Sequence, residues 1–361
     1  GTRCLGACVV ASWLLIGSFM PAQAQLPPEE ELVTLQPADG LEVTLFASGD
    51  SVTRAKLEAP CQQALRLNTG IFNREAPLIQ MMEQVFASAD QFDLIHSHLD
   101  FLAFSLSRRC RVPVVTTLHG RLDLPELVPV FRDFAELPLV SISDSQRRPL
   151  PWCNWQNTVY HGLPHDLYKF HPEPGKYLAF LGRVSPEKCP DQAIELAKRV
   201  GIPMKMAAKV DPADRAYFER VVEPLLDHPL IEFVGEITDA EKSDFIGNAI
   251  GLICPYDWPE PFGLVLIESL ACGTPVLAYR RGSIPEIIGH GVTGFISENL
   301  DEMVSQVDKL GTIDRNRCRQ MFDERFTAQR MTTDYVKIYQ QLITDAAALP
   351  GKSGQQHASN L

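Results

Sequence analysis

Residues 250–278 read IGLICPYDWPEPFGLVLIESLACGTPVLA, and this stretch decides the fold class. Its apolar run Ile250–Cys254 has the length and composition of a buried strand, and a loop containing Pro and Gly follows it. Gly263–Ala271 then reads as a buried helix that ends before Gly273, and Pro275–Ala278 reads as a second strand. A strand, a helix and a strand in this order predict two parallel strands joined by a crossover helix.

The same alternation extends toward the N-terminus. Strand-like runs recur at Phe92–His96, Val112–Leu118, Leu139–Ile142, Thr158–Tyr160, Tyr177–Leu181, Pro203–Ala207 and Ile231–Val234. Helical stretches separate the later runs: Asp191–Val200, Ala213–Leu226 and Ala240–Asn248. Repeated β-α-β units predict parallel sheets with helices on both faces and right-handed crossovers.

The length of the chain and a cluster of Pro and Gly residues divide this pattern into two α/β domains. The 361 residues exceed the roughly 250–300 that one hydrophobic core serves, and several Pro and Gly residues interrupt the pattern at His165–Gly175. We expect an N-terminal domain over residues 41–168, a C-terminal domain over 169–328, an amphipathic helix over 329–346 and a disordered tail over 347–361. Ligands of open α/β sheets bind at the carboxyl ends of the strands, so loops just after strands are the candidate sites.

Charge and cysteine content exclude several classes of protein. The chain carries 33 Lys and Arg against 45 Asp and Glu, a net charge of −12. This balance disfavours nucleic-acid binding, which needs a surface that neutralises phosphates. The nine cysteines are widely spaced and form no C-x-x-C pair, so we expect no structural zinc site. Scattered cysteines in a long chain fit a reducing compartment.

The first 40 residues read differently from the rest. Arg3 precedes an apolar run, Val9–Met20, and a small-residue stretch ends at Ala24, which is the pattern of a secretory signal peptide. The alternatives are an accidental apolar stretch or a translated segment foreign to the gene. Residues 26–40 are rich in Pro and Glu and read as a linker, and regular patterning begins with the strand-like run Leu41–Ala47.

The loop after Ile250–Cys254 carries residues suited to an anionic ligand. Gly263 permits close approach of a backbone, and free N–H groups at the start of the following helix attract an anion. Glu260 lies just before that helix, and Glu268 lies about two turns into it. Because Glu268 falls within an apolar run, where an unpaired carboxylate would be costly, we expect it to have a partner.

The loop after Tyr177–Leu181 adds two cations, Arg183 and Lys188. Arg offers a bidentate fork and Lys a point charge, and together they can neutralise a diphosphate leaving group, the role that a metal ion plays elsewhere. Two exposed surface cations are the alternative interpretation. We expect neither a metal nor another cofactor.

In this order along the chain, the motifs resemble glycosyltransferase family 4, a family of retaining enzymes. The resemblance rests on seven positions: Gly182, Arg183, Lys188, Glu260, Phe262, Gly263 and Glu268. Flanking motifs agree with it: Asp93–His98, Thr116–Gly120, Ser141–Arg147, Tyr160–Leu163, Phe233–Glu236 and Gly282–Glu286. The resemblance implies the GT-B fold, an α/β architecture of two Rossmann-like doubly wound domains facing a cleft.

The resemblance also implies a nucleotide-sugar donor held by the C-terminal domain. Arg183 and Lys188 would bind the donor diphosphate. The backbone of Phe262, Gly263 and Leu264 would help to hold it.

The remaining donor contacts and the catalytic residues follow from the same resemblance. Glu268 would accept hydrogen bonds from the ribose hydroxyls, and Gly235 and Ile237 would lie near the base. Glu260 would contact hydroxyls of the donor sugar, and His119 matches the family histidine near the sugar at the reaction centre. We therefore expect His119 and Glu260 to be the catalytic residues.

The implied activity is transfer of a hexose, with retained anomeric configuration, from a nucleotide-diphosphate sugar. UDP-glucose is the leading candidate donor, and the acceptor is a sugar, a lipid or a small molecule. Front-face attack, with the leaving phosphate as base, is the favoured mechanism of the family. Its enzymes mostly work in the cytoplasm, which argues against export directed by residues 1–24. Peripheral membrane contact and the oligomeric state stay open.

The N-terminus departs from the family pattern. Family members usually open with a strand, a glycine-rich loop and a helix, ahead of the strand matched here by Leu41–Ala47. Residues 1–40 contain no Gly-Gly pair, and we expect no comparable strand there, so the N-terminal domain is expected to be incomplete. We hypothesise that these residues replace the original N-terminus. The alternative functions are a nucleotide-sugar-binding protein without transfer activity, because the acceptor-side loop is missing, and a secreted binding protein.

Three further sites carry less weight as functional residues. His96 and His98 end a strand, where packed histidines are the commoner outcome. In the Tyr160–Leu163 motif, a backbone role for Gly162 competes with a side-chain role for the histidine before it. Ser283-x-x-Glu286 fits a capping box, so we expect Glu286 to cap its own helix.

Overall fold

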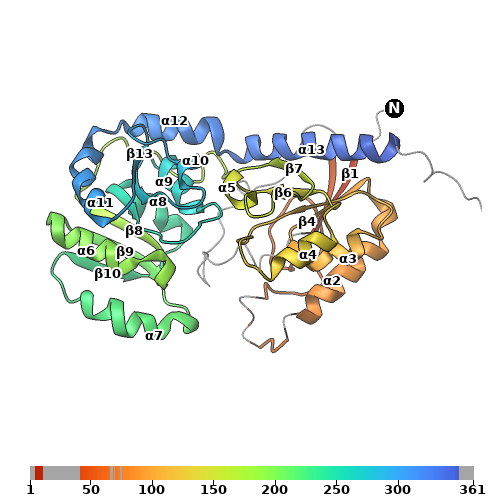
Figure 1. Ribbon diagram of the computed structural model, residues 1–361, viewed down its shortest axis with the longest axis horizontal. Coiled ribbons are helices and arrows are strands. Elements are labelled where there is room, and N and C mark those ends of the chain that lie inside the picture. The colour runs from red at the N-terminus through yellow and green to blue at the C-terminus, as the bar shows by residue number, and fades with distance from the viewer. Residues whose placement is uncertain (1–4, 11–40, 66–67, 69, 74, 349–361) are drawn as a thin grey trace, which may run out of the picture.

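The computed structural model describes residues 5–10, 41–65, 68, 70–73 and 75–348. Two parallel sheets form two lobes that lie side by side, and the long helix α13 (Ala328–Ala348) runs along one edge of the molecule (Figure 1). The α/β class and the doubly wound parallel sheets expected from the sequence are confirmed. No helix among these residues has the length and apolar character needed to cross a bilayer.

The N-terminal lobe is built on a seven-stranded parallel sheet in the order β3-β2-β1-β4-β5-β6-β7. The strands are β1 (Leu5–Val10), β2 (Leu41–Phe46), β3 (Lys56–Glu58), β4 (Leu94–Ser97), β5 (Val114–Thr117), β6 (Leu139–Ser141) and β7 (Trp155–Thr158). From β1 the chain adds strands on one side and then returns to add β4 on the other. The order therefore reverses between β1 and β4, which makes this the switch point of the sheet.

The expectation that residues 1–40 lack the first strand of this domain is wrong. Leu5–Val10 forms β1, which pairs in parallel with β2, from Leu5 opposite Leu41 to Val10 opposite Phe46. Its other edge pairs with β4, so β1 is an interior strand (Figure 1). Sequence patterning missed it because its apolar residues overlap the run assigned to a signal peptide. The expectations for the glycine-rich loop and the linker fall on residues 11–40, outside the described residues.

Helices cover both faces of this sheet. The principal ones are α2 (Glu75–Ala87), α3 (Phe104–Ser107), α4 (Leu127–Asp133) and α5 (Asp144–Arg147), with 3-10 turns η2 (Ala89–Gln91) and η3 (Asp100–Ala103). Helix α2 buries Met81 and Val85 against Phe46 and Ile95 of the sheet. These contacts remove large apolar side chains from water, which is the main favourable term in folding.

The C-terminal lobe is built on a six-stranded parallel sheet in the order β10-β9-β8-β11-β12-β13. Its strands are β8 (Tyr177–Arg183), β9 (Met204–Lys209), β10 (Ile231–Gly235), β11 (Ala249–Cys254), β12 (Val276–Tyr279) and β13 (Gly294–Ser297). The first five match the strands expected from the apolar runs, whereas β13 was missed. The order reverses between β8 and β11, and this second switch point carries both charged loops singled out in the sequence.

Helices pack on both faces of the second sheet as well. They are η4 (Pro186–Lys188), α6 (Pro190–Val200), α8 (Asp239–Gly247), α9 (Leu264–Ala271), α10 (Ile284–Ile287), α11 (Leu300–Gln306) and α12 (Arg315–Arg325), with a 3-10 segment η8 (Val307–Thr312). Every residue of α9 after Leu264 is buried, as its apolar composition predicts. This burial fixes the position of the loop ahead of the helix.

The single helix expected over Ala213–Leu226 is broken into short pieces. They are η5 (Pro212–Asp214), α7 (Arg215–Tyr217), the π-helical turn η6 (Phe218–Val222) and the 3-10 turn η7 (Glu223–Leu225). Pro224 explains the break, because proline has no N–H and its ring collides with the carbonyl four residues earlier in an α-helix. A wider π turn ahead of the proline accommodates the ring.

Helix α13, expected over residues 329–346, returns from the C-terminal lobe to the N-terminal lobe (Figure 1). Its buried face consists of Tyr335, Ile338, Tyr339 and Leu342. These side chains pack on apolar residues of the N-terminal sheet: Leu94, Val115, Val140 and Val159. Helix α13 thus completes the core of the N-terminal lobe.

Candidate functional site

The carboxyl ends of the two sheets face each other at their switch points, where a series of aromatic rings joins them. His98 follows β4, and its Nδ1 lies 2.8 Å from Nε2 of His119, which follows β5. The His119 ring stacks on that of His161 at 5.4 Å between centroids and an interplanar angle of 5°. His161 in turn meets the edge of Phe262, in the loop after β11, at 4.9 Å. We call His98, His119 and His161 the histidine series.

Burial keeps the histidine series uncharged at neutral pH. It lowers the pKa of His98 to about 4 and that of His161 to about 3, and it holds the pKa of His119 well below its usual value. Neutral imidazoles donate and accept hydrogen bonds without bringing a net charge. The series therefore suits recognition of hydroxyl groups better than neutralisation of phosphate.

Asp100, which sequence reasoning missed, lies beside this series. Its Oδ1 accepts a hydrogen bond from the backbone N–H of His119 at 3.2 Å, and burial raises the pKa of its carboxyl to about 6. Its φ of 47° is in the left-handed region, which is uncommon outside glycine and is often found at functional sites. No motif points to Asp100, because its role depends on β4 and β5 ending next to each other.

Lys188 lies beneath the loop after β11. Only 2% of the residue is exposed, and its Nζ forms a close ion pair with Oε2 of Glu260. The same carboxylate oxygen accepts a hydrogen bond from Nε1 of Trp258 at 3.0 Å, and Nζ lies 4.1 Å from the centre of the Tyr256 ring. The structure thus brings together two residues that the sequence assigned to different parts of the donor. The alternative interpretation of Lys188 as an exposed surface cation is therefore wrong, because the side chain is buried and paired with a carboxylate.

Arg183 occupies a separate, acidic environment at the end of β8. Its guanidinium lies 3.0 Å from Glu187, 3.8 Å from Asp211 and 3.9 Å from Asp214. Its Nε is buried without a hydrogen-bond partner among the described residues. Arg183 and Lys188 therefore each hold carboxylates of their own, where the sequence suggested one shared anion. A bound diphosphate would compete with three carboxylates for Arg183.

Glu268 has the partner that its apolar surroundings require. Its Oε1 lies 3.3 Å from Nζ of Lys242, which also pairs with Asp239 at 2.7 Å. Burial, followed by the charge of Glu268, holds the pKa of the Tyr168 hydroxyl well above its usual value. Burial holds the pKa of Tyr256 well above its usual value, and the charges of Glu260 and Glu268 contribute to that shift. Lys242 was missed, because nothing in its spacing links it to Glu268.

The loop ahead of α9 is held rigidly by both lobes. Ser283 donates its hydroxyl to the carbonyl of Phe262 at 2.8 Å, and Ser143 of the other lobe donates to the carbonyl of Pro261 at 2.6 Å. Gly263 caps the helix with a φ of 83°, which favours glycine. The first N–H groups of an α-helix have no partner within the helix, so those at Leu264 and Val265 point out of its start, whereas the N–H of Leu266 donates to the carbonyl of Gly263 at 3.0 Å.

Gly235 and Ile237 lie farther across the C-terminal sheet. Gly235 ends β10 with a φ of 75°, and Ile237 is half-buried against the core in the loop that leads to α8. Strand β10 is two places from β8, roughly 10 Å at the usual strand spacing. These two residues therefore lie apart from the pair formed by Lys188 and Glu260.

Glu286 contradicts the capping-box expectation. Ser283 makes no side-chain cap hydrogen bond, and the carboxylate of Glu286 crosses to the other lobe. It accepts hydrogen bonds from the backbone N–H of Asp144 at 2.8 Å and of Ser145 at 2.6 Å, and from the hydroxyl of Tyr160 at 3.1 Å. A carboxylate at a helix start gains charge-assisted bonds, and the first turn of α5 offers these to Glu286.

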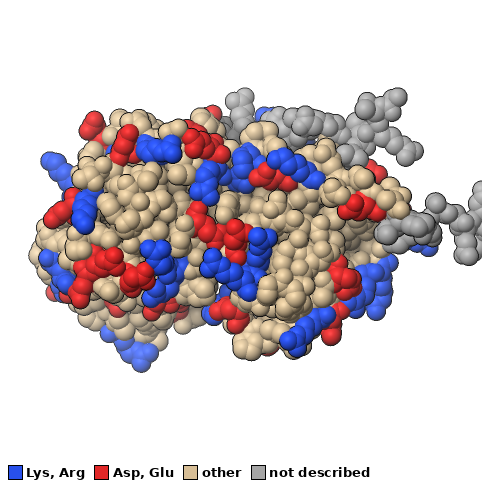
Figure 2. Space-filling model, turned by 45° about the horizontal axis from the view of Figure 1, so that its top comes forward, with Lys and Arg blue, Asp and Glu red and all other residues tan. Residues whose placement is uncertain are grey.

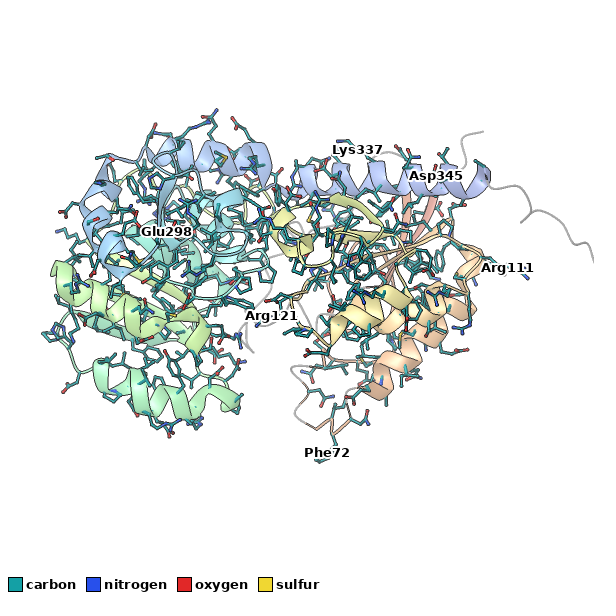
Figure 3. The ribbon with its side chains drawn as sticks, viewed as in Figure 1. Phe72, Arg111, Arg121, Glu298, Lys337 and Asp345 are labelled. Atoms are coloured by element: carbon teal, nitrogen blue, oxygen red, sulfur yellow. The ribbon has the colours of Figure 1, made fainter. Side chains whose placement is uncertain are left out.

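Charged side chains surround the region between the lobes. On the face drawn in Figure 2, basic and acidic side chains are interspersed across both lobes, and several are paired, such as Arg281 with Asp257 at 2.9 Å. Arg121, two residues after His119, lies between the lobes in Figure 3 and pairs with Asp123 at 2.7 Å. Within the described part of the chain, no three His, Cys, Asp or Glu side chains gather as a metal site.

Comparison with known families and proteins identifies relatives of both lobes. Residues 30–156 match the model of Glycosyltransferase Family 4, and residues 169–324 match that of glycosyl transferases group 1. N-acetyl-alpha-D-glucosaminyl L-malate synthase of Bacillus anthracis is 37% identical over 94 residues, 24% of this chain and 25% of that protein. D-inositol 3-phosphate glycosyltransferase of Mycobacterium marinum is 29% identical over 258 residues, 61% of this chain and 55% of that protein. The chain spans between a quarter and about three-fifths of the length of such relatives.

Solved structures share the fold of the whole molecule. Sucrose-phosphate synthase of Thermosynechococcus elongatus superposes with a TM-score of 0.72 at 17% identity, over 94% of this chain and all of that one. Alr3699/HepE of Anabaena, in complex with UDP and glucose, superposes with a TM-score of 0.66 at 17% identity, over 96% of this chain and all of that one. At this identity the likeness shows the fold alone.

Proposed function

Because the chain is a glycosyltransferase of the family 4 type with the GT-B fold, we propose that it transfers a hexose from a nucleotide-diphosphate sugar to a hydroxyl acceptor with retained configuration. UDP-glucose is the first donor to test, because a neighbouring solved structure holds UDP and glucose. One observation carries the proposal. The loop ahead of α9, where Glu260 pairs with Lys188 and Phe262 precedes Gly263, meets the neutral histidine series at His161.

The donor diphosphate is assigned to the start of α9. Its negative charge would be held by the outward N–H groups around Phe262, Gly263 and Leu264, a favourable site for a phosphate. Arg183 supplies a guanidinium from the end of β8, and its buried Nε has no partner among the described residues. Lys188 supplies charge from beneath, and a phosphate would share it with Glu260.

The nucleoside is assigned to the side of the C-terminal sheet toward β10. Glu268 keeps lone pairs beyond its bond to Lys242, and these can accept hydrogen bonds from ribose hydroxyls. Gly235 ends β10, two strands from β8, and Ile237 follows it in the next loop. We assign the base to this side of the sheet.

The transferred sugar is assigned to Glu260 and His119. His119 Nδ1 is buried without a partner among the described residues, so a sugar hydroxyl would satisfy it. The carboxylate of Glu260 is held in place by Lys188 and Trp258, in the loop that meets the histidine series at Phe262. In front-face transfer the acceptor hydroxyl attacks the anomeric carbon as the bond to phosphate breaks, and its proton passes to the leaving phosphate oxygen.

Binding without transfer is the second candidate. It rests on a missing acceptor-side glycine-rich loop, and that loop falls on residues 11–40, outside the described residues. Strand β1 is present in the centre of the sheet, and the lobe presents His98 and His119 toward the C-terminal lobe. We further propose that the protein works in the cytoplasm, because nine cysteines that are widely spaced along the chain fit a reducing compartment.

The proposal is tested by screening nucleotide sugars for thermal stabilisation of the full chain. A ligand present at 100 times its Kd stabilises the native state by about 2.7 kcal/mol. We expect one nucleotide-diphosphate sugar to raise the Tm, and its free nucleoside diphosphate to do so as well. We also expect the chain to release nucleoside diphosphate from that sugar when candidate acceptors are added. Stabilisation without any release would favour the binding protein, and no stabilisation by any nucleotide would contradict both.

A further inference from the structure

His119 is held on every side but one. Its Nε2 hydrogen bonds to Nδ1 of His98, its backbone N–H donates to Asp100, and its ring stacks on His161. Only Nδ1 has no partner among the described residues, although it is buried. A buried polar atom left unpaired costs free energy, so this nitrogen is poised to bind a hydroxyl.

A neutral imidazole carries one donor nitrogen and one acceptor nitrogen. In the 2.8 Å bond between His98 and His119, one ring must therefore donate and the other accept. If His98 donates, Nδ1 of His119 carries a proton and is a donor. If His119 donates, its Nδ1 is an acceptor. The bond to His98 thus determines what His119 offers to a ligand.

His98 is itself fixed by the core of the lobe. Its ring lies 4.2 Å from that of His96, which is 1% exposed. Both nitrogens of His96 are engaged, Nδ1 with the Tyr339 hydroxyl at 2.7 Å and Nε2 with the Thr117 hydroxyl at 2.7 Å. The expectation that His96 is a packed structural residue is confirmed. His98 packs on this fixed ring on one side and hydrogen bonds to His119 on the other, so it links the core of the lobe to the histidine that faces the ligand.

We propose that His98 is a positioning residue that holds His119 in one tautomer and one ring orientation. Nδ1 of His119 then acts only as a donor, or only as an acceptor, toward a hydroxyl of the transferred sugar. This inference rests on the proposed function, which places the sugar beside His119. A site built to hydrogen bond a hydroxyl rejects sugars that lack it, because its own polar atom is then left unpaired. His98 would thereby contribute to the choice of donor sugar without touching it.

The first test does not depend on activity. In ¹⁵N NMR of the full chain, the two ring nitrogens of His119 are expected to differ in wild type as those of one dominant tautomer do. In His98→Leu they are expected to shift toward a mixture of the two tautomers. The same tautomer of His119 in both proteins would overturn the inference whether or not the protein is a transferase.

The second test separates positioning from folding. We expect His98→Leu to lower kcat/KM for the nucleotide sugar about tenfold, the value of one hydrogen bond, while the Kd for the free nucleoside diphosphate stays unchanged. His98→Asn, whose side-chain amide lies near the place of Nδ1, is expected to restore most of the loss. His228→Leu, in the turn before β10, is the control for loss of a histidine. Equal activity of His98→Leu and wild type would overturn the inference and leave the proposed function standing.

Discussion

Replacing Lys188 with methionine is expected to destabilise the protein by about 3–5 kcal/mol and to remove most of its affinity for a nucleoside diphosphate. The stability loss follows because the change leaves the Glu260 carboxylate, 6% exposed, without the cation that pairs with it. The loss of affinity follows because the diphosphate would lose one of the two cations assigned to it. Chemical denaturation and calorimetric titration measure the two effects separately.

The double variant Lys188→Met with Glu260→Gln tells the two roles of Lys188 apart. Both charges are then absent, so no carboxylate is left uncompensated, and we expect most of the lost stability to return. Nucleotide affinity is expected to stay low, because the cation is still missing. If the double variant bound nucleoside diphosphate as wild type does, Lys188 would be a structural residue only. If Lys188→Met alone were as stable as wild type, the ion pair would not support the loop.

Lowering the pH from 7 to 5 is expected to destabilise the native state on the order of 2–4 kcal/mol per pH unit through the buried groups of the N-terminal lobe. Burial lowers the folded pKa of four histidines, so they stay neutral in the native state while the unfolded chain takes up protons below about pH 6.5. The four are His96, His98, His119 and His161. Their contribution to stability is present above that pH and is lost as the pH falls toward 4.

The carboxyl of Asp100 acts in the opposite direction. Its folded pKa is raised to about 6, so near pH 5 the native state holds a proton that the unfolded state has released. Four protons taken up on unfolding minus one released leave about three, which sets the sign and the size of the slope. Urea denaturation at pH 7, 6 and 5 measures it, and His161→Asn is expected to reduce the uptake by about one proton. Stability that did not change over this range would contradict neutral burial of the histidines.

The sequence predicted the alternation of strands and helices because local apolar runs, such as Ile250–Cys254 before the helix at Leu264, indicate each element separately. It missed β1 because a short apolar strand beside a longer apolar run reads equally well as a signal peptide. It also overestimated one helix, because Pro224 lies within the stretch Ala213–Leu226 that was expected to be helical throughout. Periodicity describes what a segment prefers, whereas the pairing of β1 with β2 and β4 depends on the assembled sheet.

For the site, the sequence pointed to residues but not to their partners. Lys188 and Glu260 were assigned to the phosphate and the sugar, yet they form one buried pair across 72 positions of the chain. Asp100 and Lys242 were not singled out, since their contacts with His119 and Glu268 appear only when separate strands and helices come together. The capping-box pattern at Glu286 was misleading because a helix start in the other lobe offers that carboxylate two N–H groups.

The central claim is that the start of α9, with Arg183 and Lys188, binds the diphosphate of a nucleotide sugar. Calorimetric titration of the full chain with a matched nucleoside diphosphate and monophosphate, UDP and UMP first, tests it most directly. We expect the diphosphate to bind at least about tenfold more tightly, a difference of 1.4 kcal/mol, and Arg183→Met to remove most of that difference. Equal affinity for the two nucleotides, or no binding of any nucleoside diphosphate, would contradict the claim.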